Sequence, residues 1–81
     1  MSKIIRQPIT VMPDGAGRPQ CFTWRRRQYK VEALVEDWLE AGSWWDGEGE
    51  KAFYRLQCGE GLYEIYHDLA EKAWYLYRVL D

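Results

Sequence analysis

Arg25, Arg26 and Arg27 form an unbroken basic run between the aromatic residues Trp24 and Tyr29. Guanidinium groups neutralise phosphates, and aromatic rings beside them offer faces on which unpaired bases stack. These five residues therefore predict a contact with single-stranded nucleic acid, presented from a hairpin tip. The alternative is a solvated turn whose arginines pair with the acidic residues that follow in the sequence.

The residue types that carry catalysis or bind metals are few and scattered. His67 is the only histidine, and on a strand its neighbour Asp68 would point to the opposite face, so the two cannot easily act as base and orienting carboxylate. Cys21 and Cys58 belong to no metal-spaced motif and lack a histidine nearby in sequence. We therefore expect no enzyme, no cofactor and no metal, and two free thiols.

The adjacent pair Trp44-Trp45 has two interpretations. Neighbours on a strand cannot both face one core, so one indole would be exposed and could anchor a protein interface. A bulge or turn could instead bury both rings, each with its N–H satisfied.

Charge is unevenly distributed along the chain, although the net charge is only −2. Residues 1–30 carry seven basic side chains and one acidic one, whereas residues 31–50 carry seven acidic side chains and no basic one. A split of this kind indicates either a polyanion-binding surface or two segments that lie side by side and neutralise each other. Because the whole domain is acidic, we favour the second interpretation.

The elements that must position these residues are mostly strands. Residues 53–58, 62–67 and 73–80 are aromatic and branched runs separated by turn-like breaks, which predicts an antiparallel meander. In the last run neither face is clearly polar, so it is either a central strand or one that meets a partner.

Earlier strands are expected at residues 4–12, 20–24 and 28–35. Pro8 would place the first on an edge or give it a bulge at that residue. The stretch 31–41 has apolar residues at helical spacing, so a short helix over 33–41 and a bulged strand both fit it.

Length and composition place these elements in one small domain. The 81 residues contain five Trp, six Tyr and two Phe, which can build a compact core. We predict a single domain over 1–81, with 1–3 frayed, as a mainly β fold. It would be a small antiparallel sheet or a partly open SH3-like barrel of five to six strands. With no apolar run that could cross a bilayer and no signal peptide, we expect no membrane contact and a cytoplasmic location.

The order and spacing of several motifs resemble a small bacterial domain family of unknown function. The most specific parts are the pair Trp44-Trp45 and the closing pattern Trp-x-Leu-x-Arg-Val-x-Asp from Trp74 to Asp81. The resemblance starts near residue 16 and also includes Gly17-Arg18-Pro19, Phe22-Thr23-Trp24, Tyr29-Lys30-Val31, Trp38, Phe53-Tyr54-Arg55 and residues 63–68. His67 departs from it, since a basic residue such as arginine is expected there.

That family occurs alone or as a tail on Y-family, ImuB-like translesion polymerase homologues. The resemblance therefore implies a non-enzymatic interaction module in a DNA-damage tolerance assembly, with such a polymerase homologue as its partner. It supplies no catalytic residues. Trp44 or Trp45 would contact the protein partner, and the second hypothesis is weak binding of single-stranded DNA by the Arg25–Arg27 hairpin.

Overall fold

The fold is built from seven β-strands, and the computed structural model describes residues 3–42 and 49–80. In chain order the strands are β1 (Lys3–Pro13), β2 (Pro19–Trp24), β3 (Arg27–Lys30), β4 (Ala33–Glu40), β5 (Lys51–Cys58), β6 (Gly61–Asp68) and β7 (Ala73–Leu80). Every pair of neighbouring strands is antiparallel. The mainly β prediction is confirmed, but the strand count was too low because residues 28–35 divide between β3 and β4.

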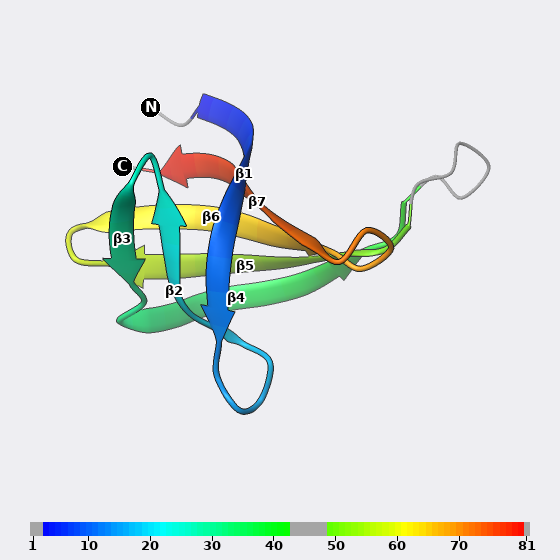
Figure 1. The fold of residues 1–81 in the computed structure, drawn as a ribbon, viewed down its shortest axis with the longest axis horizontal. Helices are drawn as coiled ribbons and strands as arrows, with labels where there is room; N and C mark the ends of the chain where they lie inside the picture. The colour runs from blue at the N-terminus through cyan, green and yellow to red at the C-terminus, as the bar shows by residue number, and fades with distance from the viewer. Residues whose placement is uncertain (1–2, 43–48, 81) are drawn as a thin grey trace.

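The strands form one sheet that curls into a half-barrel, in the order β3-β2-β1-β7-β6-β5-β4. In Figure 1, β1, β2 and β3 cross over the meander of β5, β6 and β7, so the two halves of the sheet enclose the inner face. Only Val31 and Glu32 connect the edge strands β3 and β4. Their amides donate to the carbonyl oxygens of Gln20 at 3.1 Å and Gln57 at 2.8 Å, which holds the two ends of the sheet together.

β1 is the strand that changes partner. Up to Ile9 it pairs with β7, and from Thr10 it pairs with β2. β1 is therefore an inner strand, not the predicted edge strand, and its bulge lies around Arg6 and not at Pro8. Pro8 is tolerated because it pairs only with β7, beyond the end of the β2 ladder, so its missing N–H interrupts at most one ladder.

The core lies between the crossing halves of the sheet. Leu56, Ile65 and Leu76 of the meander have no exposed surface, and Phe22 of β2 packs against them with 1% of its surface exposed. The ring of Tyr29, on β3, stacks on Phe22 with centroids 4.9 Å apart. These contacts fix the β2–β3 hairpin on the meander. The central place of β7 in the sheet explains why neither of its faces is polar.

The segment that fitted either a helix or a bulged strand is strand β4. Its register against β5 shifts between Leu34 and Glu36, which marks a bulge at Val35. A bulge adds one residue and breaks the two-residue alternation, so the apolar positions imitate helical spacing. Val35 and Leu39 are 51% and 65% exposed, so no single buried stripe exists. Of the two alternatives for this segment, the bulged strand is confirmed and the short helix over 33–41 is not.

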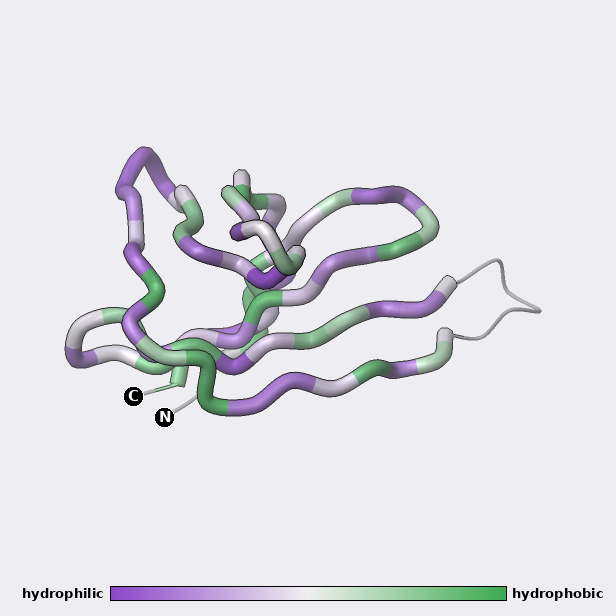
Figure 2. The backbone as a smooth tube through the Cα atoms, turned by 90° about the horizontal axis from the view of Figure 1, so that it is seen from below, coloured by the Kyte–Doolittle hydropathy of each residue, from purple (hydrophilic) through white to green (hydrophobic). Residues whose placement is uncertain are grey.

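Hydrophilic and hydrophobic residues alternate along much of the chain in Figure 2. The same view shows the tip of the β2–β3 hairpin as a hydrophilic run that stands away from the meander. At the N-terminus, Lys3 pairs with Val79 of β7, whereas residues 1–2 of the segment predicted to fray lie outside the described residues. The fold thus presents the arginine run at an exposed corner.

Candidate nucleic-acid interface

The β2–β3 hairpin ends in a two-residue turn made of Arg25 and Arg26. Trp24 pairs with Arg27 at the end of the ladder, and the φ angles of the two turn residues are 52° and 63°. Positive φ at both positions is the pattern of a type I′ turn, for which Asn-Gly is strongly preferred. For residues with a Cβ, left-handed backbone costs about 1–2 kcal/mol each. The chain therefore keeps arginine where the backbone disfavours it.

The structure brings part of the predicted set together. The guanidinium of Arg25 lies 4.6 Å from the ring centroid of Trp24, whose indole N–H donates to Gln7 Oε1 at 2.8 Å. Arg26 and Arg27 are exposed beside them. Tyr29 is half-buried and stacked on Phe22, so it supports the hairpin and does not offer an open face.

The described part of the acidic segment, residues 31–42 and 49–50, does not pair with the arginines of the hairpin. Within residues 3–42 and 49–80, no carboxylate forms an ion pair with Arg25, Arg26 or Arg27. Glu36 of β4 instead pairs with Arg55 at 3.2 Å. In the described residues, no ion pair therefore joins the hairpin to the acidic segment, and the positive charge of the hairpin faces solvent.

A hollow of about 310 Å³ lies beside the hairpin tip. We call it the hairpin hollow, and its lining residues are Ile4, Ile5, Gln7, Trp24 and Arg25. Ile4 is 54% exposed, so the hollow combines an apolar wall with a guanidinium and the amide of a glutamine. A surface of this composition can accept the face of a base next to its phosphate.

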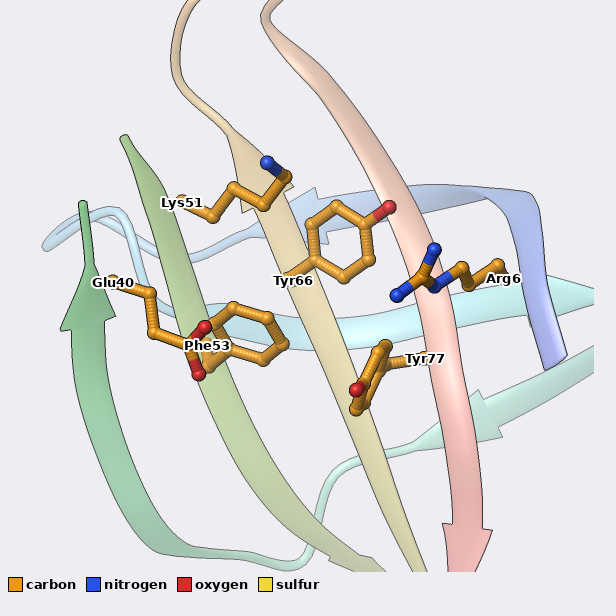
Figure 3. Close-up of a pocket in the computed structure, with 6 residues that line it drawn as sticks. All are labelled: Arg6, Glu40, Lys51, Phe53, Tyr66 and Tyr77. Carbon is orange, nitrogen blue, oxygen red and sulfur yellow. The ribbon is translucent and has the colours of Figure 1, made fainter. Parts of the chain in front are cut away.

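A second hollow lies on the outer face of the meander, the face turned away from the core, and measures about 320 Å³. Figure 3 shows the side chains that converge on this outer hollow, which are Arg6, Glu40, Lys51, Phe53, Tyr66 and Tyr77. Burial raises the pKa of the Tyr66 hydroxyl, and the positive charge of Arg6 opposes that rise. Sequence reasoning missed this site, although the lack of a polar face on the last strand was a signal for it.

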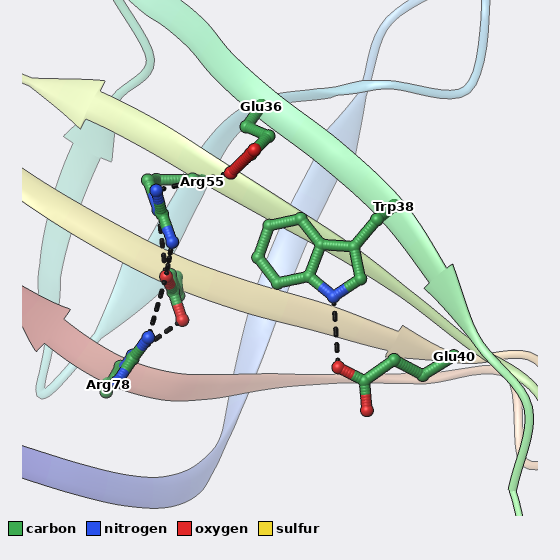
Figure 4. Close-up of polar contacts among 6 residues, drawn as sticks. Glu36, Trp38, Glu40, Arg55 and Arg78 are labelled. Atoms are coloured by element: carbon green, nitrogen blue, oxygen red, sulfur yellow. Dashed lines mark hydrogen bonds and ion pairs between the residues drawn. The ribbon is translucent and has the colours of Figure 1, made fainter.

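Beside the outer hollow, a buried carboxylate joins two arginines. Glu64 is 1% exposed. Its Oε2 accepts a hydrogen bond from Arg55 Nε at 2.8 Å, and its Oε1 accepts one from Arg78 Nε at 2.7 Å. Arg55 also lies over the ring of Trp38, and Figure 4 shows its guanidinium between Glu36 and Arg78. Burial acts to raise the pKa of Glu64, but hydrogen bonds and positive charge from the two arginines lower it overall.

The other candidate groups, His67, Asp68 and Cys58, lie in surroundings that fit a role in the fold. His67 stacks on Trp74 at 4.2 Å, and burial lowers its pKa. The Asp68 carboxylate accepts backbone N–H bonds from Ala70 and Glu71, which closes the β6–β7 turn. Burial raises the pKa of the Cys58 thiol to about 11. None of these contacts pairs a nucleophile with a general base.

The described residues contain neither a metal-binding cluster nor a membrane-spanning helix. No group of three or more His, Cys, Asp or Glu side chains is placed to hold a metal ion there. That part of the chain also has no helix long and apolar enough to cross a membrane. Trp44 and Trp45, predicted as a protein contact, lie outside the described residues.

Comparison with known proteins identifies the family to which this chain belongs. A family model described as "Domain of unknown function (DUF6504)" matches residues 1–81. No match was found among curated proteins or among solved structures.

The double substitution Arg25→Asn, Arg26→Gly should stabilise the domain. Asparagine and glycine adopt positive φ with less strain, and we expect a gain of about 1–2 kcal/mol after allowing for the larger unfolded-state entropy of glycine. Urea denaturation measures this change. A variant that is less stable than the parent would show that the arginine turn is not strained.

The substitution Glu64→Gln should destabilise the domain. Removing one partner of a buried ion pair costs about 3–5 kcal/mol, and we expect the low end because both arginines keep about a third of their surface exposed. Since the folded-state pKa of Glu64 is lowered, its contribution is complete above the ordinary value of 4.5 and is lost as pH falls below it.

Urea denaturation between neutral and acidic pH measures this, and the gap between parent and variant should shrink in acid. Glu36→Gln is the matched control, because its 55% exposed carboxylate pairs with the same Arg55 and should contribute less than about 1 kcal/mol. Equal losses in the two variants would contradict the assignment.

Proposed function

The chain belongs to the DUF6504 family of domains of unknown function, and we propose that it is a non-enzymatic binding module whose β2–β3 hairpin contacts single-stranded DNA. The observation that carries this proposal is the pair of arginines in the two positive-φ positions of the turn. Residues held in disfavoured backbone conformations cluster at functional sites, where the surrounding structure holds them in place. A turn selected for stability alone would use Asn-Gly.

The surroundings of the turn support phosphate as the ligand. Arg25, Arg26 and Arg27 are exposed, and guanidinium groups bind phosphate oxygens in a bidentate manner. The hairpin hollow beside Trp24 adds an apolar surface for a base. A duplex stacks its bases away from such a surface, so a single strand fits the combination better.

The place of this module in a Y-family polymerase assembly rests on the family resemblance of the sequence. A protein partner is the second candidate function, favoured by edge strand β4. This edge exposes the apolar side chains of Val35 and Leu39 together with the carboxylates of Glu36, Asp37 and Glu40. An edge strand with this composition fits an extended basic segment of the polymerase homologue, added as a further strand.

The variant Arg25→Asn, Arg26→Gly should bind single-stranded DNA more weakly than the parent. Each phosphate contact on a single strand contributes about 0.7 to the slope of log K against log salt, so losing two should reduce that slope by about 1.4. Fluorescence anisotropy at several salt concentrations measures both quantities.

Lys72→Asn is the matched control for this experiment. Lys72 is also a basic residue with positive φ, at 56°, but it lies in the β6–β7 turn. Its substitution removes a charge and relieves strain away from the hairpin, so affinity should stay close to that of the parent. A hairpin variant that binds as tightly as the parent would refute the nucleic-acid proposal.

Leu39→Lys should weaken capture of the polymerase homologue while leaving the fold intact. The added charge would repel a basic segment at the edge, and Leu39 is 65% exposed, so little packing is lost. Affinity capture with the purified homologue measures this effect. Leu69→Lys is the control, because Leu69 is 41% exposed in the β6–β7 turn; equal capture by parent and Leu39→Lys would exclude β4 as the contact.

A further inference from the structure

We infer that the outer hollow binds one unpaired nucleotide, with its phosphate at Arg6, its base against the ring of Tyr77 and an amino group of the base at Glu40. The inference rests on the proposed function in taking single-stranded DNA as the source of the nucleotide. The site itself is separate from the hairpin and lies on the opposite face of the meander.

Arg6 repeats the feature that marks the hairpin. It has a φ of 53° and lies in the β1 bulge, where the pairing with β7 skips from Ile4 to Gln7. The guanidinium is 5.8 Å from the ring centroid of Tyr77. In the described residues no carboxylate forms an ion pair with it, so its positive charge can take a phosphate.

Aromatic rings form the floor and one wall of the hollow. Phe53 and Tyr66 are 4% and 9% exposed, with centroids 5.1 Å apart, so they close the floor and leave the half-buried Tyr77 as the ring with an accessible face. Tyr77 is perpendicular to Phe53, at 87° and 5.3 Å, so it closes one side. The volume of about 320 Å³ falls at the low end of small-ligand pockets, which span about 300–1,000 Å³. A flat base suits this shape.

Glu40 gives the site a preference among bases. Its Oε2 accepts the indole N–H of Trp38 at 3.0 Å, which holds the carboxylate in place, and Figure 3 shows the group directed over Phe53. A carboxylate accepts from the exocyclic amino group of cytosine but repels the carbonyl oxygen that thymine has at the same position. We therefore expect the site to prefer cytosine over thymine.

The two hollows lie on either side of the same bend in β1. Ile5 and Gln7, the neighbours of Arg6, line the hairpin hollow with Trp24 and Arg25, whereas Arg6 lines the outer hollow. One strand of DNA that passes around β1 would meet basic and aromatic groups on both faces. This continuity favours a nucleotide over an aromatic peptide, which would not require a basic path to the hairpin.

The test uses amide chemical-shift titrations of the domain with deoxycytidine and thymidine 5′-monophosphates. Shifts should cluster on Phe53, Tyr66 and Tyr77, and deoxycytidine monophosphate should bind about fivefold more tightly, the low end of the discrimination that a base contact gives. Glu40→Gln should abolish the preference. Arg6→Asn, which tolerates positive φ, should weaken binding of both nucleotides.

The hairpin variant Arg25→Asn, Arg26→Gly separates the two proposals. It should bind the mononucleotides as the parent does while losing affinity for longer single strands. Titrations that leave the outer hollow unshifted, or a thymidine affinity equal to that of deoxycytidine in parent and Glu40→Gln alike, would overturn this inference without affecting the hairpin. Shifts there with a phenylalanine-containing peptide but with neither nucleotide would assign the hollow to a protein ligand.

Discussion

The change of partner along β1 is the constraint on which the rest of the structure depends. A single strand pairs first with β7 and then with β2, so the sheet must turn at the point of exchange and lay the β2–β3 hairpin across the meander. The crossing buries Phe22 against the leucines and isoleucine of the meander. The bulge around Arg6 lies within the part of β1 that pairs with β7, and it turns successive side chains toward different hollows. The core and both candidate contact surfaces follow from this one strand.

Basic residues occupy every position of positive φ that is not glycine in the described chain: Arg6, Arg25, Arg26 and Lys72. Left-handed backbone is ordinarily filled by glycine, asparagine or aspartate, since these adopt it with the least strain. A small domain has only a modest margin of stability, so strain at several positions is a sizeable fraction of the total. Three of the four residues line or adjoin the two hollows. The association of strain, positive charge and concave surface favours binding over purely structural roles.

Much of the fold was predictable, because it rests on local patterns. The meander followed from aromatic and branched runs, and the hairpin followed from the break at the arginines. β4 was ambiguous because its bulge at Val35 shifts the alternation, and bulges have no reliable signature in sequence. The role of Glu64 was also hidden. A glutamate in a strand ordinarily suggests an exposed face. Here Arg55 and Arg78, on the two neighbouring strands, pair with Glu64 and cover its carboxylate, so the sheet packs side chains on both faces.

The sequence by itself determined the strands of the meander and where the basic charge lies, because side-chain type and spacing act over a few residues. It also placed a turn within the run Arg25–Arg27, and in the structure this turn consists of Arg25 and Arg26 while Arg27 begins β3. Tertiary structure alone decided that Tyr29 supports the core while Trp24 borders a hollow, since that difference depends on how the hairpin crosses the meander. It also decided that Arg6, Glu40 and Tyr77 meet at one site. Residues so distant in sequence come together only when the sheet order and its curl are set, and these depend on pairing between remote strands.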